Sequence, residues 1–229
     1  MKKAFTMMEL VFVIVVIGIL AAVVMPRTGS NRLNEAAIQV VSHIRYTQHL
    51  AMIDDKFDSA DNDWYRLRWQ IKFSKVGGSD NKWAYAIFSD ADVGSGHDGN
   101  PNDNETAVNP LDNSKKLTGG YSGTIEYGDS KATKELNLGH SYSVEDIDLV
   151  GGCNISNDGK KRISFDYLGR LMYENPKDLD SSYKAGAINR LVISQCRIEI
   201  CTVSDCTAAT SEQKVTIAIE PETGYAHIL

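Results

Sequence analysis

Residues 1–27 of the chain read MKKAFTMMELVFVIVVIGILAAVVMPR, and one charge in this stretch raises a question about the whole protein. Sixteen consecutive apolar residues run from Leu10 to Met25, and Glu9 lies directly before them. A carboxylate without a partner in apolar surroundings costs several kcal/mol even after relaxation. The sequence keeps the carboxylate of Glu9 at the start of its most apolar segment, which indicates a function that needs this charge.

Two ordinary interpretations of the segment leave Glu9 unexplained. Lys2 and Lys3 before an apolar run are typical of a secretory signal peptide, but the run is longer than a usual signal core, and no small-x-small cleavage site follows it before Pro26. A plain membrane anchor is the second interpretation, because the 21 residues from Phe5 to Met25 would form a helix of about 31 Å, which just spans a bilayer core. The lysines would then stay cytoplasmic and the C-terminal part would lie outside.

A third interpretation explains the carboxylate. The string Ala4-Phe5-Thr6-Met7-Met8-Glu9, followed by the apolar run and Pro26, resembles the class III signal of type IV pilins and type II secretion pseudopilins. The resemblance implies that a prepilin peptidase cuts between Ala4 and Phe5, on the cytoplasmic side, and methylates the new N-terminal Phe5. The family usually has glycine at the position of Ala4, and alanine is also a small residue.

The resemblance also implies a partner for Glu9. In the family, the glutamate of one subunit is thought to meet the terminal amine of its neighbour as subunits stack into a filament. At low dielectric such a pair attracts strongly, while an unpaired glutamate is penalised. Gly18 and Pro26 both weaken a helix, and in the family the segment between such residues can lose helicity on assembly. The alternative for Glu9 is a side chain that reaches the lipid headgroups from one turn inside the mature end.

Membership of this family would fix the architecture and the partners. Residues 1–4 would be the leader, 5–29 the transmembrane and assembly helix, and 30–229 a periplasmic α+β domain. One long N-terminal helix, half in the membrane and half in the domain, would pack on antiparallel β-sheet. The protein would be a single-pass protein of the bacterial inner membrane that enters a pseudopilus or pilus. Its partners would be other pilin or pseudopilin subunits, the prepilin peptidase and an inner-membrane assembly platform with its ATPase.

The apolar pattern after Pro26 predicts this kind of domain. From about Asn31 to Asp54, apolar residues recur at helical spacing, which predicts an amphipathic helix with one face on a sheet. The residues of this face are Leu33, Ala36, Ala37, Val40, Val41, Ile44 and Ala51.

Alternating sequence then predicts strands. Residues 64–73 and 82–89 should form a hairpin. Further strands are expected at 161–171, 190–204 and 214–229, and the last of these contains a good turn at Pro221-Glu222-Thr223-Gly224. The polar face of the first strand and the start of the second would be a solvated surface, with nucleic-acid contact as the alternative, and it carries Arg66, Arg68, Lys72 and Lys82.

Residues 90–124 are polar and rich in Asp, Asn and Gly, which predicts a long solvated loop or a locally disordered insertion. Its core, DADVGSGHDGNPNDNE, also suggests a calcium loop, because hard cations need several oxygen ligands. The spacing does not fit an EF-hand, since Asp103 stands where the loop glycine should follow Asp98, Asn100 and Asn102. Some pseudopilins carry calcium loops, so calcium is the one cofactor considered, and no metal site is assigned.

Four cysteines agree with an exported domain, because disulfides persist in oxidising compartments. Cys153, Cys196, Cys201 and Cys206 allow three pairings, and none belongs to a C-x-x-C motif. Cys201 and Cys206 are close enough in the sequence to form a disulfide across a strand turn, which leaves Cys153 and Cys196 as the second pair. Zinc binding is the alternative, although no histidine lies at a suitable spacing.

A narrower resemblance lies near the C-terminus. The F-x-x-x-G-R motif of Phe165 to Arg170 and the I-x-I-x-x-x-T-G motif of Ile217 to Gly224 are similar to motifs of H-type minor pseudopilins and related minor pilins. Some of those relatives bind DNA for uptake through a terminal G-R-x-R, whereas residues 224–227 of this chain read Gly-Tyr-Ala-His. The formal net charge of −6, or −8 without Lys2 and Lys3, also repels nucleic acid, which is not expected as a partner.

No catalytic pattern is recognisable, so the sequence does not indicate an enzyme. None of the five histidines belongs to a nucleophile, zinc or phosphate-loop motif. The resemblance of residues 1–26 and of the two C-terminal motifs implies a minor pseudopilin or pilin subunit, assembled through its N-terminal helix for protein secretion. The alternatives are a DNA-uptake minor pilin and a membrane-anchored periplasmic enzyme.

Overall fold

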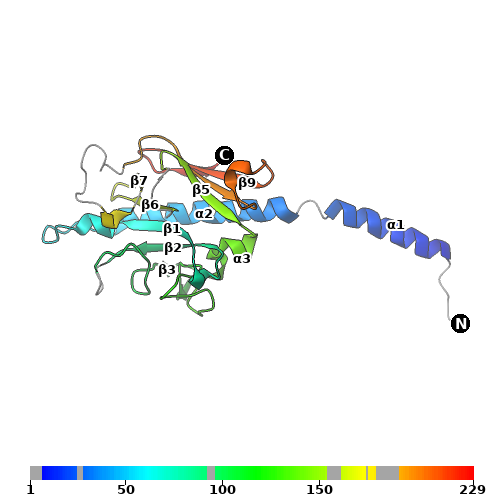
Figure 1. Ribbon diagram of the computed structural model, residues 1–229, viewed down its shortest axis with the longest axis horizontal. Coiled ribbons are helices and arrows are strands. Elements are labelled where there is room, and N and C mark those ends of the chain that lie inside the picture. Colours follow the sequence, from blue (N-terminus) through cyan, green and yellow to red (C-terminus); the bar gives the residue numbers. More distant parts are fainter. Residues whose placement is uncertain (1–6, 25–27, 92–95, 154–160, 174, 179–190) are drawn as a thin grey trace.

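The computed structural model describes residues 7–24, 28–91, 96–153, 161–173, 175–178 and 191–229. Helix α1 (Met7–Val24) extends away from an α+β domain, and helix α2 (Thr28–Ile53) runs along the length of that domain (Figure 1). The chain therefore combines helices with antiparallel sheets, as predicted.

The single long N-terminal helix that we predicted is not seen, because two shorter helices take its place. α1 has 18 residues and α2 has 26. Pro26 lies in the sequence interval between them, and proline removes a backbone donor and disfavours helical geometry in the residue before it. None of the helices in the described residues combines the length and the apolar character that spanning a membrane requires.

Two four-stranded antiparallel sheets form the domain. The first has the order β2 (Trp83–Ser89), β1 (Trp69–Lys75), β6 (Lys161–Phe165) and β7 (Leu171–Tyr173). The second has the order β10 (Ala226–Ile228), β9 (Lys214–Ile219), β8 (Cys196–Cys201) and β5 (Asp146–Gly151). A separate hairpin pairs β3 (Val108–Asn109) with β4 (Asp112–Lys116). The short helices are η2 (Trp64–Leu67), η3 (Gly77–Ser79), η4 (Lys134–Leu136), α3 (Leu138–Tyr142), η5 (Pro176–Asp178) and η6 (Cys206–Ala208).

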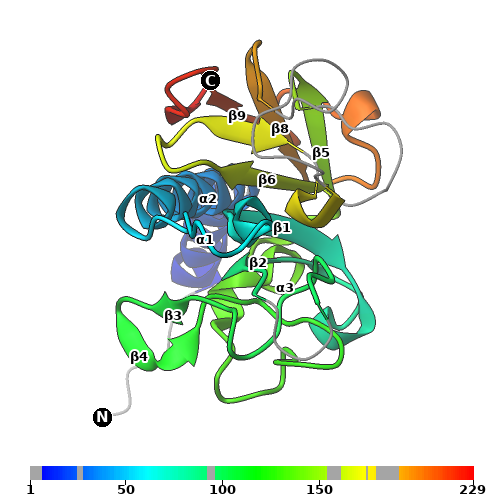
Figure 2. The ribbon, with the colours of Figure 1, turned by 90° about the vertical axis from the view of Figure 1, so that its left-hand side faces the viewer.

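The amphipathic pattern of α2 is confirmed. All seven apolar residues predicted for its inner face are buried. They join one apolar core with β1, β6, β8, β9 and β10, so α2 contacts both sheets at once. Figure 2 shows α2 nearly end-on beside β6 and β1, with β8 and β9 above it and the β3–β4 hairpin below. One helical stripe thus holds the two sheets together.

Disulfides fix β8 at both ends. Its first and last residues, Cys196 and Cys201, are bonded to Cys153 and Cys206 respectively. This is the pairing that the sequence predicted. The C-terminal hairpin is also confirmed, since β9 and β10 pair antiparallel on either side of the turn at residues 221–224.

The strand predicted at 64–73 is only partly correct. Residues Trp64–Leu67 form the short helix η2, and β1 begins at Trp69. The Trp64 ring packs edge-on against Phe57, with ring centroids 5.3 Å apart. This local aromatic contact favours a compact turn over the extended conformation that alternation alone would predict.

The prediction that the polar face of the first strand is solvated is wrong. Arg68, Gln70 and Lys72 are all buried. The two other basic residues assigned to that face, Arg66 and Lys82, each pair with an acidic side chain. Within the described residues the four cations therefore form no continuous basic surface. They give no support to nucleic-acid contact at this face.

Residues 96–124 are mostly turns and irregular structure, as predicted, but they are not solvated throughout, and this explains why the polar face is buried. They contain the β3–β4 hairpin, and isolated bridges join Thr106 to Phe88 and Thr118 to Ala86 of β2. Leu117 is fully buried. The segment covers the polar face of the first sheet, so polar side chains there point into protein instead of water.

Lys72 ties this covering segment to the sheet. Its Nζ donates to the carbonyl of Gly99 (3.1 Å), to Asn100 Oδ1 (2.7 Å) and to the Tyr121 hydroxyl (2.8 Å). The same hydroxyl donates to Asn100 Oδ1 at 2.7 Å. Since a buried ammonium needs hydrogen bonds to offset its desolvation, these contacts make Lys72 a clamp between β1 and residues 99–121.

Replacing Lys72 with methionine should destabilise the domain. The substitution preserves most of the volume but leaves the buried Gly99 carbonyl and Asn100 amide without their charged donor, so we expect a loss of about 3 kcal/mol in the free energy of unfolding. Denaturant titration followed by tryptophan fluorescence measures this loss. The exposed Lys75→Met on the same strand is the control and should stay within about 0.5 kcal/mol of the parent. Equal effects of the two variants would contradict the proposal that Lys72 holds residues 99–121 against β1.

The covering segment also buries two carboxyl groups close together. A hydrogen bond from Ser89 N to the carbonyl of Glu105 (3.2 Å) places Glu105 beside Asp90 at the end of β2. Burial, with the neighbouring charges of Asp90 and Asp98, raises the pKa of Glu105 to about 7. Burial raises the pKa of Asp90 as well, against the opposing effect of its hydrogen bond from Gly99 N. The folded chain therefore favours a protonated Glu105.

This shift predicts a pH dependence of stability. A carboxyl whose pKa is higher in the folded than in the unfolded state contributes to stability. The contribution is complete when the pH lies below the unfolded-state pKa, and it disappears as the pH rises through the folded-state pKa of about 7. The difference in unfolding free energy between the parent and Glu105→Gln should therefore fall between about pH 4.5 and 7. Urea titrations across this range measure it. A difference that stays constant with pH would show that Glu105 does not titrate in this window.

Candidate functional site

The N-terminal site residues predicted from the sequence are described only in part. Ala4, Phe5 and Pro26 lie outside the described residues. Glu9 lies in the first turn of α1, and Gly18 lies inside the same helix. A side chain at Gly18 would meet no atom within 4 Å, so this glycine is not required by packing within the chain.

The surface of α1 is apolar and uncovered over the part that is described. Every large apolar side chain from Met7 to Leu20 has more than a third of its surface exposed. These twelve residues are Met7, Met8, Leu10, Val11, Phe12, Val13, Ile14, Val15, Val16, Ile17, Ile19 and Leu20. A helix that is apolar on all faces is normally buried in protein or lipid. Its cover must therefore come from outside the part of the chain that is described.

The position of Glu9 suits a carboxylate. The N-terminal end of a helix carries partial positive charge, which stabilises an acidic side chain in the first turn. A second positive group that approached this end would find Glu9 at the boundary of the apolar surface.

The two short C-terminal motifs come together in space. The Gln48 side chain of α2 donates from Nε2 to the carbonyl of Gly169 (2.8 Å) and to that of Thr223 (2.7 Å). Gly224 has φ +64°, and a Cβ there would lie 2.4 Å from the Gly169 carbonyl oxygen. The close approach of the two turns requires a glycine at position 224. These motifs therefore fasten both hairpins to α2, a structural role that sequence spacing did not reveal.

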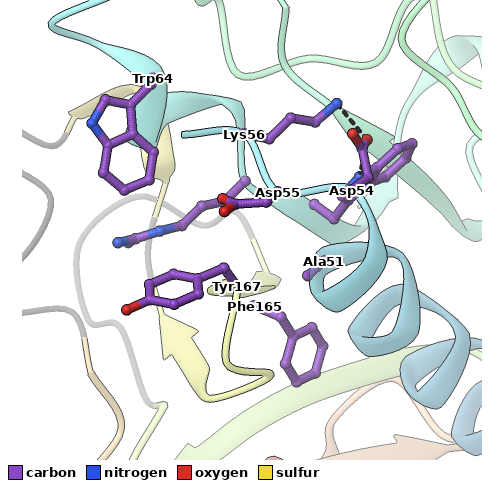
Figure 3. A pocket seen from close by; sticks show the side chains of 9 residues that line it. Ala51, Asp54, Asp55, Lys56, Trp64, Phe165 and Tyr167 are labelled. Atoms are coloured by element: carbon purple, nitrogen blue, oxygen red, sulfur yellow. Dashed lines mark hydrogen bonds and ion pairs between the residues drawn. The ribbon is translucent and has the colours of Figure 1, made fainter. Parts of the chain in front are cut away.

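A small cavity lies at the C-terminal end of α2. Figure 3 shows Trp64 and Tyr167 on one side of it and Asp54 and Lys56 on the other. Asp54 Oδ2 pairs with Lys56 Nζ (2.5 Å) and accepts a hydrogen bond from the Trp69 indole (2.8 Å). The volume of about 20 Å³ holds one water molecule at most. This cavity is part of the packing and offers no ligand site.

A much larger groove separates α2 from the β3–β4 hairpin. We call it the α2–β4 groove. Its volume is about 580 Å³, and its lining includes Ile38, His43, Leu111, Lys115, Glu135 and Leu136. These residues come from three segments that are far apart in the sequence, so no motif predicts the groove.

A hydrogen-bonded network fixes the floor of the α2–β4 groove. Gln39 Nε2 donates to the Glu135 carbonyl (3.0 Å) and to the Tyr85 hydroxyl (2.9 Å), while Gln39 Oε1 accepts from the Tyr142 hydroxyl (2.6 Å). The Tyr85 hydroxyl lies 2.6 Å from His43 Nδ1. Burial lowers the pKa of His43 to about 4 and raises that of Tyr85, so both groups are neutral near pH 7. Because the Tyr85 oxygen accepts from Gln39 Nε2, we assign the tyrosine proton to His43 Nδ1 and the imidazole proton to Nε2.

The acidic segment considered for calcium is largely engaged in local contacts. Asp98 Oδ1 accepts from the backbone N–H of Asn100, Asn100 Oδ1 accepts from Lys72, and Asp103 pairs with Lys131 (2.5 Å). The described residues contain no group of three or more His, Cys, Asp or Glu side chains arranged to hold a metal.

No protein-family model, curated protein or solved structure matches the chain. The similarity to pilins and pseudopilins is therefore a resemblance of residues 1–26 and of the two C-terminal motifs.

Proposed function

We propose that the chain is a minor pseudopilin or minor pilin, a subunit that joins a type II secretion pseudopilus or a type IV pilus through its N-terminal helix. The observation that carries the proposal is α1, an apolar helix that is exposed from Met7 to Leu20 and has Glu9 in its first turn. A subunit of a filament covers such a helix with the helices of its neighbours. No reaction is assigned to the chain.

The proposed assembly starts from a precursor in the bacterial inner membrane, with residues 1–4 in the cytoplasm and the domain in the periplasm. Prepilin peptidase removes the leader and methylates Phe5, which creates a cation at the new terminus. An assembly platform then adds the subunit to the filament. There Glu9 of one subunit meets the terminal amine of its neighbour, and their attraction at low dielectric offsets the cost of placing either charge in apolar surroundings.

The domain is suited to the compartment that this route implies. Two disulfides, Cys153–Cys196 and Cys201–Cys206, persist in an oxidising periplasm and not in a reducing cytosol. The net charge of −6 and the absence of a continuous basic surface among the described residues favour secretion or pilus assembly over DNA uptake.

Substitution of Glu9 tests the assembly mechanism. Glu9→Ala and Glu9→Gln should each reduce incorporation into filaments at least about tenfold, because a charge pair at low dielectric exceeds the roughly 1.4 kcal/mol that a tenfold change requires. Incorporation is measured by immunoblotting of sheared or purified filaments from cells that express each variant at equal level.

Two controls separate assembly from folding. Glu126→Ala removes an exposed carboxylate from the domain and should leave incorporation unchanged. Protease resistance of the domain should be the same in all variants. Normal incorporation of Glu9→Gln would contradict the proposed pairing of Glu9 with the terminal amine of a neighbour.

A further inference from the structure

The α2–β4 groove has the size and the composition of a binding site. We infer that it binds an extended segment of a different protein, in which an aliphatic side chain stands next to a lysine or arginine. The volume of about 580 Å³ lies within the roughly 300–1,000 Å³ typical of ligand pockets. The inference goes beyond the proposed assembly through α1, because the groove is part of the domain and uses no residue of that helix.

Two exposed aliphatic side chains stand on opposite walls of the groove. Ile38 on α2 is 61% exposed and Leu111 on the β3–β4 hairpin is 94% exposed. The hairpin turn holds Leu111 in place, since its backbone N–H donates to Asn109 Oδ1 at 2.9 Å. Leu136, which is buried, also lines the groove. An aliphatic side chain that entered between Ile38 and Leu111 would be removed from water together with both of them.

The rim of the groove selects the charge of the partner. Glu35, Asp112 and Glu135 contribute three carboxylates, and Lys115 contributes one ammonium, so the formal charge of the lining is −2. His43 adds no charge, because it is neutral near pH 7. Complementary charge favours a lysine or arginine beside the aliphatic side chain. A purely apolar lipid chain would make no favourable electrostatic contact with these carboxylates.

The floor of the groove offers a fixed hydrogen-bond donor. The network through Tyr85 and Gln39 assigns the proton of His43 to Nε2, on the ring edge away from the tyrosine. A backbone carbonyl of an extended segment is a suitable acceptor for this N–H. Because Gln39 is held by Glu135 and Tyr142, the donor is oriented before a partner arrives.

A second copy of this chain is a poorer occupant than a different, basic protein. The whole chain carries a net charge of −6, so two copies repel each other on average, and the groove is itself acidic. Figure 2 shows α2 and the β3–β4 hairpin, the two elements that carry Ile38 and Leu111, on the same side of the domain.

Binding of synthetic peptides to the full-length chain in detergent micelles tests the inference. The probe is a fluorescein-labelled Gly-Ser-Lys-Leu-Lys-Ser-Gly peptide, compared with Gly-Ser-Glu-Leu-Glu-Ser-Gly and Gly-Ser-Lys-Ser-Lys-Ser-Gly in fluorescence anisotropy titrations. We expect the first peptide to bind at least tenfold more tightly than either of the others. Leu111→Ser and Glu135→Lys should each weaken its binding at least tenfold.

Leu168→Ser is the matched control, because Leu168 is also an exposed leucine in a turn but does not line the groove. It should leave peptide binding unchanged, as should Glu9→Ala, so a failure of the assembly proposal does not affect this test. Equal binding of the three peptides, or equal binding by all variants, overturns the inference. So does self-association or vesicle binding that depends on Leu111, since the groove would then accept a second copy or lipid.

Discussion

The buried stripe of α2 is the constraint on which the domain depends. Seven apolar side chains on one face of this helix contact strands of both sheets, and removing this contact would leave the sheets without a common core. Burial of apolar surface is the main favourable term in folding, and α2 buries its apolar face within the chain. α1 has even more apolar surface but no such contact among its described residues. The difference between the two helices is the physical reason to expect a subunit of an assembly.

The polar layer behind the first sheet links the fold to the α2–β4 groove. Lys72 holds residues 99–121 against β1, and this segment includes the β3–β4 hairpin that forms one wall of the groove. Buried charged groups of this kind often contribute less to stability than apolar side chains of the same volume would. Here their directional hydrogen bonds fix where the hairpin lies, and with it the distance between Ile38 and Leu111.

Sequence patterns predicted the structure correctly where the determining contacts are local or follow one period. The inner face of α2, the C-terminal hairpin and the disulfide pairing follow from helical spacing, turn chemistry and the short separation of Cys201 from Cys206. The polar face of β1 was predicted wrongly, because alternation identifies two faces but not what covers each of them. The covering segment begins more than twenty residues later and is polar itself, so it had no apolar signal.

The groove and the N-terminal helix differ in how much the sequence reveals. No pattern joins His43 to Tyr85 or Ile38 to Leu111, because each pair meets only after the domain has folded. Glu9 and the apolar run, in contrast, are contiguous, so the sequence alone is enough to suggest a role for them.

The proposed charge pairing requires a processed N-terminus, so that a positive terminus can meet Glu9 of a neighbour. Mass spectrometry of the protein isolated from the membrane of its own host tests this most directly. We expect a chain that begins at Phe5 and carries one extra methyl group on its terminal nitrogen. A mature chain that keeps Met1, or one that begins after the apolar run, would contradict it.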